Sequence, residues 1–473
     1  MNLYLLSDEL ILGTALILIL LIDFVSKNKR IIVYFFNIII FALLIFVIFN
    51  KREGQAFFSA FVYDGVSWFS KIVFLSGAFL TGLLSLSTIR IKEKYYGAYY
   101  MILGASTLGM MFLASSKELI TLYIGLELAT ISLYALSAIY KDDSNSLEAG
   151  IKYLILGAIS SGLLLYGISI VYGFTRTTYL EKIISLISQN GVDSAFVIGV
   201  ILIILGTAFK LSAVPMHVWT PDVYQGAPTA ITGFISVASK SAGFIFVMRL
   251  FSYTFLKFDY IWVPVISIIA FLTMTVGNLI AIPQKNIKRL LAYSTISQAG
   301  YILVGFVGAS VIGMSSVLFY VFVYTFTNIA AFAVVAGVEK QTNSCNINDY
   351  ASLSQRNPLL ALTFMLSLLS LAGIPPLAGF VGKFYLFYAA MQKGYLWLVI
   401  AAALNSTISL YYYLLVLKQL YIRNEKTEGE KIKFPAGIIF VLVICIAVII
   451  IFGIMPSDVI DITINASQGM FVK

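Results

Sequence analysis

Fourteen apolar stretches, each about long enough to cross a membrane as a helix, follow one another along this chain with short loops between them. A helix needs about 20 apolar residues to cross the roughly 30 Å of hydrocarbon in a bilayer. The stretches show no alternation of apolar and polar residues, so they predict helices rather than the strands of a membrane barrel. The expected spans are approximately 9–25, 31–49, 66–88, 97–115, 119–140, 151–173, 195–215, 229–252, 261–282, 289–308, 311–338, 358–391, 397–422 and 434–454.

The composition agrees with a single polytopic membrane domain over residues 1–473. Apolar residues make up 60% of the chain and charged residues 11%, whereas a soluble domain is about half apolar and a quarter charged. Two cysteines are too few for an ordinary iron–sulfur cluster, and one histidine, His217, excludes multi-histidine metal sites. We therefore expect no cofactor or metal in this chain. The net charge of +9 lies mostly in short loops, which indicates membrane orientation rather than a nucleic-acid partner.

The distribution of lysine and arginine over the loops predicts the orientation. Sixteen of them fall on one side of the expected membrane and eight on the other, which places the richer side in the cytoplasm. An even number of spans then places both termini in the periplasm. Asp8 and Glu9 precede the first apolar run without a basic region or a cleavage site, so we expect no removable signal peptide.

Several charged residues fall inside the expected spans, where each costs about 2.5–3.5 kcal/mol on insertion scales. Lys71, Arg249 and Lys418 lie near span ends, and we expect their long side chains to reach the interface. Lys152 follows Glu148 by four residues, so these two could simply pair on one helical face.

Four other charged residues lie too deep in their spans to reach the interface: Glu127, Lys210, Lys240 and Lys383. They could be static ion pairs that fix helix packing, or groups that bind and release protons. The sequence by itself leaves both readings open.

Two spans are interrupted by proline at related places, five helices apart. The seventh runs into Pro215, Pro221 and Pro228, and the twelfth contains Pro375 and Pro376. Interrupted helices in corresponding positions of two halves are typical of inverted-repeat transporters, whose sites lie at the breaks. The predicted organisation is a three-helix segment over 1–95, repeat halves over 96–256 and 257–425, and a C-terminal helix within 426–473. His217, beside the first break, is a candidate proton relay.

Both breaks also carry the resemblance of this chain to a known family. Residues 209–229 (FKLSAVPMHVWTPDVYQGAPT) and 370–384 (SLAGIPPLAGFVGKF) resemble the signatures of the antiporter-like membrane subunits of respiratory complex I. Residues 150–167 (GIKYLILGAISSGLLLYG) and Arg356-Asn-Pro are similar to one branch of that family, subunit N of bacterial NADH-quinone oxidoreductases. The similarity extends over nearly the whole chain.

The resemblance implies a fold, a function and residue roles. It implies two inverted five-helix repeats and proton export across the bacterial inner membrane, coupled to electron transfer from NADH to quinone. NADH, FMN, iron–sulfur clusters and quinone would then be bound by partner subunits, and other membrane subunits would surround this chain in the lipid bilayer. It also implies a Glu–Lys pair, a central lysine, a lysine at the second break and two accessory groups: Glu127 with Lys210, Lys240, Lys383, and Lys152 with His217.

Two other functions remain compatible with the sequence. A subunit of a multi-subunit cation/proton antiporter would share the fold and both broken spans. A passive assembly subunit would use the same buried lysines only as structural ion pairs. Genome neighbours that encode redox subunits would favour the oxidoreductase.

Overall fold

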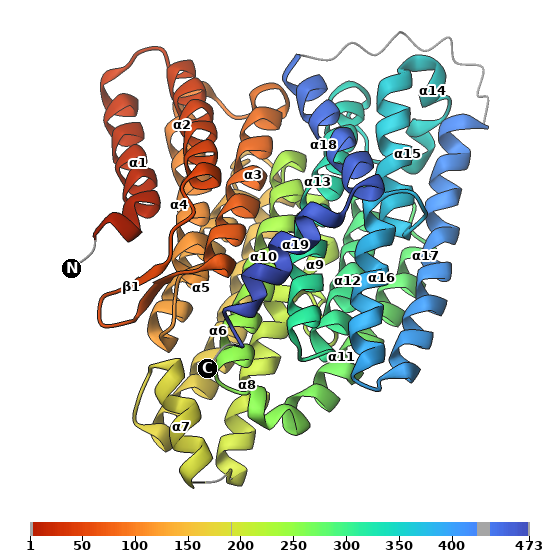
Figure 1. The fold of residues 1–473 in the computed structure, drawn as a ribbon. Coiled ribbons are helices and arrows are strands. Elements are labelled where there is room, and N and C mark those ends of the chain that lie inside the picture. Colours follow the sequence, from red (N-terminus) through yellow and green to blue (C-terminus); the bar gives the residue numbers. More distant parts are fainter. Residues whose placement is uncertain (1–2, 191, 423–435, 472–473) are drawn as a thin grey trace.

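The computed structural model of this protein describes residues 3–190, 192–422 and 436–471, and in that part of the chain it is almost entirely helical (Figure 1). The loop cations Arg423, Lys426, Lys431 and Lys433, and Lys473 at the C-terminus, lie outside the described residues. The helices are α1 (Ser7–Val25), α2 (Arg30–Phe49), α3 (Gly65–Thr88), α4 (Tyr96–Ala114), α5 (Leu119–Ser137), α6 (Ser144–Thr175), α7 (Leu180–Asn190), α8 (Ser194–Leu211), α9 (Trp219–Gly226), α10 (Thr229–Tyr253), α11 (Asp259–Ala281), α12 (Ile287–Val307), α13 (Val311–Thr342), α14 (Leu353–Arg356), α15 (Pro358–Ala372), α16 (Ala378–Gln392), α17 (Leu396–Tyr421), α18 (Ala436–Ile454) and α19 (Ser457–Gln468).

The expected membrane spans are confirmed. Among the described residues, thirteen helices are long and apolar enough to cross a bilayer. The broken pair α15–α16 lies where the twelfth span was expected, and neither half is long enough to cross alone. Helices prevail because lipid offers no hydrogen bonds, so each backbone amide must find its partner within the segment.

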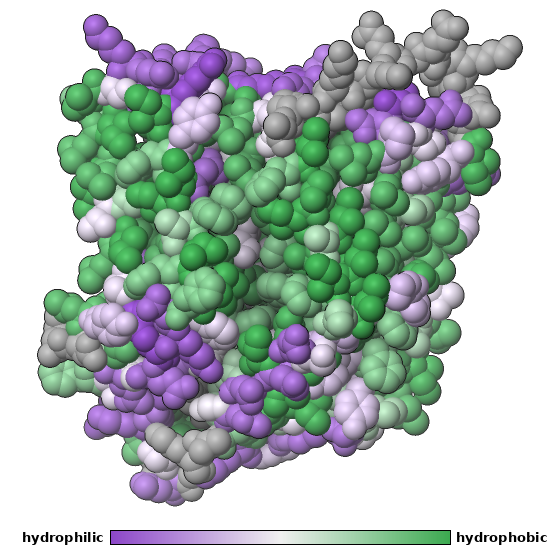
Figure 2. Space-filling view, turned by 45° about the horizontal axis from the view of Figure 1, so that its top comes forward, coloured by the Kyte–Doolittle hydropathy of each residue, from purple (hydrophilic) through white to green (hydrophobic). Residues whose placement is uncertain are grey.

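The surface shows the same division between lipid and water. Figure 2 shows a broad apolar belt around the middle of the visible face, with hydrophilic residues gathered toward its upper and lower ends. Many large apolar side chains are exposed in the structure, such as Phe24, Ile124 and Leu404. In a soluble protein such a belt would be unstable in water, whereas here it matches the hydrocarbon layer.

The helices form two sets with the same order of elements. The first set is α4, α5, α6, the broken pair α8–α9 and α10, and the second is α11, α12, α13, the broken pair α15–α16 and α17. The two sets begin at opposite ends of the bundle, so they are inverted relative to each other, as in antiporter-like folds. α10 of the first set packs against α13 of the second where the two sets meet, and the apolar stretches of both helices are fully buried.

A β-hairpin and two short helices were not expected from the sequence. Strands β1 (Gly54–Ala56) and β2 (Phe61–Tyr63) form an antiparallel hairpin between α2 and α3. Helix α7 follows α6, and helix α19 packs against α3 and α13 near the C-terminus (Figure 1). All three are too short to span a bilayer, which is why a search for long apolar runs passes over them.

Candidate proton-relay site

The first break is stabilised by side chains that hydrogen-bond the carbonyl groups it frees. Helix α8 ends at Leu211, and Ser212 adopts a left-handed backbone conformation that turns the chain. The indole Nε1 of Trp219 donates to the carbonyl of Phe209 at 3.1 Å, and the Ser239 hydroxyl donates to the carbonyl of Lys210 at 3.0 Å. These two carbonyl groups, which the interruption of the helix frees, therefore have side-chain partners although the helix does not continue.

A close helix crossing positions the last turn of α8. A Cβ atom on Gly206 would lie 2.7 Å from the backbone nitrogen of Leu164 on α6, so only glycine fits. The contact brings Lys210, one turn later on α8, to 3.1 Å from the Ser161 hydroxyl of α6. Small residues at helix interfaces allow this approach in membrane proteins.

Glu127 on α5 and Lys210 on α8 form a largely buried ion pair, the pairing that the family resemblance implies. The Nζ atom of Lys210 lies 3.1 Å from Oε1 of Glu127, and the side chains are 1% and 15% exposed. Nζ also donates to Thr130 at 3.2 Å and to Tyr134 at 3.1 Å. Ser161 donates to the same Oε1 atom of Glu127 at 2.7 Å, so it touches both members of the pair.

Lys240 lies in the middle of α10 and faces the first break from the other side. Its Nζ donates to the Ser212 hydroxyl at 3.0 Å and lies 5.9 Å from the ring centre of Tyr224. Among the described residues, no carboxylate lies within 4.0 Å of it. Lys240 thus contacts a hydroxyl at the break, whereas Lys210 contacts a carboxylate.

Lys383 occupies the corresponding place at the second break. Helix α15 ends at Ala372, and Gly373 follows with a φ of 86°, a left-handed conformation that favours glycine. The Nζ atom of Lys383 donates to the freed Ala372 carbonyl at 3.1 Å and to Ser406 at 3.0 Å. It also lies 4.1 Å from the ring centre of Tyr301. Both broken spans thus place a buried lysine against the break.

Polar side chains also fill the layer between the two breaks. Gln298 on α12 donates to the carbonyl of Leu371 at 2.9 Å, next to the bond of Lys383, and accepts from Tyr320 on α13. Asn328 on α13 donates to Tyr324 at 2.9 Å and to Ser236 on α10 at 2.6 Å. Buried polar groups in this number are costly unless they are hydrogen-bonded, and these are.

Lys152 lies at the rim of the bundle rather than deep inside it. It pairs with Glu148 at 2.8 Å, as the spacing predicted, and also with Asp222 on α9 at 2.7 Å. Asp222 in turn contacts Arg289 on α12 at 2.9 Å, so this ion cluster ties the short helix α9 to both sets of helices. The second partner of Lys152 is 70 residues away, and no local spacing could have indicated it.

His217 lies in the first break, and within the described residues it forms no ion pair with a carboxylate. It is partly buried, and its Nδ1 atom makes no hydrogen bond within the described part of the chain. The geometry therefore brings Glu127 and Lys210 into direct contact, places Lys240 across the break from them, and leaves His217 beside the group.

Comparison with known proteins identifies the family. Residues 116–409, more than half of the chain, match the family model described as NADH:quinone oxidoreductase/Mrp antiporter, TM. The chain is 44% identical over 425 residues to NADH-quinone oxidoreductase subunit N of Moorella thermoacetica, covering 90% of this chain and 89% of the relative. The chain belongs to the NADH-quinone oxidoreductase subunit N family. This confirms both the resemblance to the antiporter-like subunits at the two breaks and the likeness to subunit N over residues 150–167 and Arg356-Asn-Pro.

Solved structures of membrane complexes contain chains with the same fold as this member of the subunit N family. A chain of respiratory complex I from Thermus thermophilus with bound aureothin superposes with a TM-score of 0.84 at 29% identity, covering 96% of this chain and 98% of that one. A chain of the Mrp complex from Dietzia sp. DQ12-45-1b superposes with a TM-score of 0.89 at 19% identity, covering 100% and 98%. At that identity the second match shows the shared fold alone.

The expectation that the side chain of Lys71 reaches the membrane interface is wrong. Its side chain is 0% exposed, and its Nζ lies 3.1 Å from Asp8 and 2.7 Å from Glu9, both buried in the first turn of α1. Arg52 pairs with the same Asp8 and closes the cluster. Asp8 and Glu9, which the sequence placed before the first span, are therefore part of its buried face, and they neutralise a lysine that cannot reach water.

The same expectation is wrong for Arg249 and right for Lys418, which is exposed in the last turn of α17. Arg249 is fully buried and makes two hydrogen bonds to Asp64, at 2.6 and 2.7 Å, with a third to the carbonyl of Ala114. Burial by itself raises the pKa of Asp64, but the Arg249 charge and hydrogen bonds hold that pKa below its ordinary value. The chain supplied a partner for the arginine from 185 residues away.

Proposed function

We propose that this chain is a proton-translocating subunit N of a bacterial NADH-quinone oxidoreductase, and that Glu127, Lys210, Lys240 and Lys383 carry the protons. One observation carries the proposal. Lys210, at the end of the broken helix α8, is 1% exposed and lies 3.1 Å from Glu127. A second buried lysine, Lys240, lies across that break. A static packing pair needs neither the break nor the second lysine.

The proposed cycle uses the Glu127–Lys210 contact to change how strongly Lys210 holds its proton. While the carboxylate stays close, the ammonium form of Lys210 is stabilised. When Glu127 moves away, desolvation favours the neutral amine, and the proton passes toward Lys240. Lys383, on the half-helix that follows the second break, would pass it on toward the periplasm.

The energies involved are of the right size. At 3.1 Å and an effective dielectric constant of about 20, two opposite charges attract by about 5 kcal/mol. Moving one charge through a membrane potential of about 150 mV requires about 3.5 kcal/mol. Separating this one ion pair therefore changes the affinity of Lys210 for its proton by more than the free energy that one proton needs to cross the membrane, provided that an outside source supplies the work of separation.

The driving energy would come from partner subunits. We propose that NADH, FMN, iron–sulfur clusters and quinone are bound there. Lys152 and His217 would be accessory groups at the rim and the break. The proposed setting is the inner membrane with both termini periplasmic, and repeat halves over 96–256 and 257–425.

The experiment compares two Lys→Met substitutions in the intact complex. Lys240→Met removes a buried amine, whereas Lys418→Met removes an exposed one at a span end. The complex would be purified through a tag on this chain, reconstituted into sealed vesicles, and assayed for NADH:quinone reductase activity and proton uptake.

We expect the Lys240→Met complex to assemble but to lose most of its proton uptake, and the Lys418→Met complex to behave as wild type. Co-purification without NADH:quinone activity would refute the assignment to the oxidoreductase. Full proton uptake by an assembled Lys240→Met complex would refute the relay and favour a passive subunit.

A further inference from the structure

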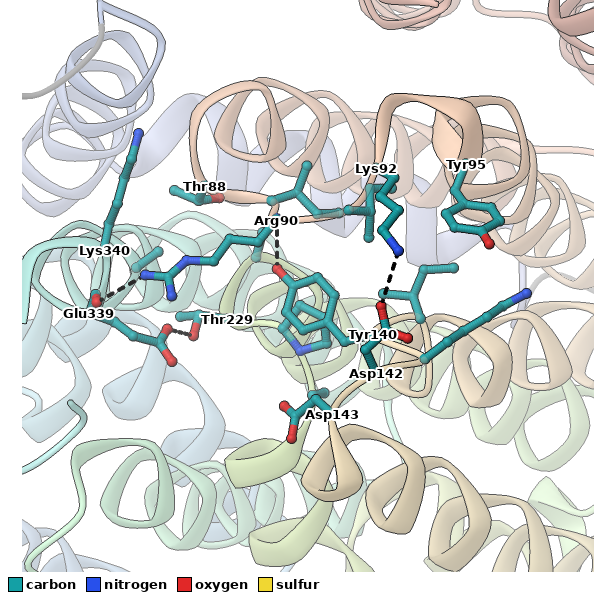
Figure 3. A pocket seen from close by; sticks show the side chains of 18 residues that line it. Thr88, Arg90, Lys92, Tyr95, Tyr140, Asp142, Asp143, Thr229, Glu339 and Lys340 are labelled. Atoms are coloured by element: carbon teal, nitrogen blue, oxygen red, sulfur yellow. Dashed lines mark hydrogen bonds and ion pairs between the residues drawn. The ribbon is translucent and has the colours of Figure 1, made fainter. Parts of the chain in front are cut away.

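A cavity of about 400 Å³ opens at the end of the bundle where the α3–α4 and α5–α6 connections lie. Its remaining wall is the start of α10 and the last turn of α13 (Figure 3). The lysines of the proposed relay do not line it. Charged groups of both signs do: Arg90, Lys92, Lys141, Lys340, Asp142, Asp143 and Glu339.

Glu339 is the carboxylate of this cavity that contacts α10. Figure 3 shows its side chain directed at Thr229, the first residue of α10, whose hydroxyl donates to Oε2. Its other oxygen lies 3.9 Å from Nζ of Lys288, which itself donates to the carbonyl of Ala227 at 2.8 Å. Asp142, on the opposite side of the cavity, is turned toward Lys92 instead.

A line of hydroxyl groups leads from Thr229 along α10 to Lys240. Thr229, Thr232, Ser236 and Lys240 are spaced by three, four and four residues, so they share one face of the helix. We call the first three the hydroxyl stripe. At a rise of about 1.5 Å per residue, the eleven steps cover about 16 Å, all of it buried.

Polar groups of neighbouring helices border the stripe. Asn328 of α13 donates to Ser236 at 2.6 Å, and the hydroxyl of Thr232 donates to the carbonyl of Tyr224 at 3.1 Å. The Tyr224 hydroxyl is buried and makes no hydrogen bond within the described residues, although its ring lies 5.9 Å from Nζ of Lys240. Neighbouring positions of the stripe are separated along the helix axis by about 4.5–6 Å, the rise of three or four residues. One water molecule that hydrogen-bonds two polar atoms bridges a gap of about this length.

Hydrogen bonding of each hydroxyl to its own helix does not explain why the stripe lies only between the cavity and Lys240. Buried hydroxyls often bond their own helix, and Ser236 does donate to the carbonyl of Gly233 at 2.6 Å. Beyond Lys240, however, the same face continues with apolar residues, including Phe244 and Val247. The hydroxyls thus occupy only the part of the face that joins the cavity to the lysine.

We propose that this cavity, Glu339 and the hydroxyl stripe form the cytoplasmic proton-uptake route to Lys240. The inference rests on the proposed function. A hydronium ion in the cavity gives its proton to the Glu339 carboxylate and leaves water. The carboxylic acid then passes a proton through Thr229 and the stripe to the neutral amine of Lys240, which becomes an ammonium, and the carboxylate is restored. No electrons move.

The test compares two variants on the route with two matched controls in the assembled complex. Glu339→Gln and Ser236→Ala alter the route, while Asp259→Asn alters a similarly exposed carboxylate outside the cavity and Ser241→Ala another buried hydroxyl of α10. Proton uptake into vesicles and coupled NADH oxidation would be measured for each.

We expect both controls to behave as wild type. Glu339→Gln should slow proton uptake about tenfold, less than the hundredfold or more that a positioned proton-transfer group can contribute, because cytoplasmic water still reaches Thr229. Ser236→Ala should also slow proton uptake. The double variant Glu339→Gln/Ser236→Ala should not be slower than Lys240→Met, since all three substitutions act on one route.

Wild-type uptake in both Glu339→Gln and Ser236→Ala, with Lys240→Met impaired, would overturn the route while leaving the relay intact. Normal uptake in Lys240→Met would instead overturn the proposed function itself. If Glu339→Gln fails to assemble, Glu339→Asp, which keeps a titratable carboxylate, and Ser236→Ala, which removes no charge, decide the question. Loss of uptake in Asp259→Asn equal to that in Glu339→Gln would also refute the route.

Discussion

Replacing Glu127 with glutamine tests the Glu127–Lys210 contact most directly, because it removes the charge and keeps the shape. The amide oxygen of glutamine can still accept from Lys210 and from Ser161, which lie 3.1 and 2.7 Å from Oε1 of the native carboxylate. Lys210 also keeps its bonds to Thr130 and Tyr134. We therefore expect the complex to assemble.

The size of the effect follows from the geometry. The pair contributes about 5 kcal/mol of attraction at 3.1 Å in a medium with an effective dielectric constant of about 20. If only a third of that energy acts at the slow step, proton transport falls more than about tenfold, since about 1.4 kcal/mol in a barrier changes a rate tenfold. A Lys210→Arg complex should not transport protons at the wild-type rate, because arginine keeps its proton at physiological pH.

The assay is proton uptake into sealed vesicles per NADH oxidised, measured for Glu127→Gln beside Glu93→Gln. Glu93 forms an exposed pair with Arg30 at 3.0 Å, and such surface pairs contribute about 1 kcal/mol or less. Glu93→Gln should therefore match wild type. An assembled Glu127→Gln complex with wild-type uptake would refute the reasoning, and loss of assembly with normal uptake in the residual complex would favour a static ion pair.

Three further predictions test other parts of the structure. Reporter fusions at Lys94 and Lys288 should report the cytoplasm, and fusions at Gln189 and Lys473 the periplasm, because of the asymmetry in basic loop residues; a cytoplasmic C-terminus would mean that the spans are miscounted. Lys383→Met should assemble, since Ser406 still donates to the freed Ala372 carbonyl at 2.9 Å, but should lower proton uptake; unchanged uptake would remove Lys383 from the route. Asp64→Asn should destabilise the protein by about 3–5 kcal/mol in thermal unfolding at neutral pH, because it takes the carboxylate from a buried Arg249. Since the pKa of Asp64 is lowered in the folded protein, this contribution is present at neutral pH and is lost as the pH falls through that lowered pKa, so the two proteins should converge only in acid.

Much of the site could be predicted from the sequence because membranes make charges conspicuous. Glu127, Lys210, Lys240 and Lys383 stand out in apolar runs, and the structure buries all four or nearly so. The breaks were visible as prolines, since proline lacks the amide hydrogen that a continuous helix needs. Both signals are local, and both survive without knowledge of the fold.

Partnerships between distant residues could not be predicted in the same way. Lys71 and Arg249 looked like residues that reach the interface, yet each is neutralised in the interior by an acidic residue far along the chain. Asp222 joins Lys152 to Arg289 for the same reason. A short stretch of sequence shows that a charge is present but not which helix will lie against it.

The sequence by itself determined that this chain is a bundle of about fourteen membrane helices with two broken spans, because hydrocarbon forces every backbone amide to pair locally and apolar length is read directly from the residues. Only the tertiary structure decided which charges meet. Glu127 and Lys210 are separated by 83 residues, and the hydroxyl stripe of α10 gains a direction only when α13 places Glu339 at its start. Side-chain contacts between helices depend on how the helices cross, and that packing belongs to the whole bundle.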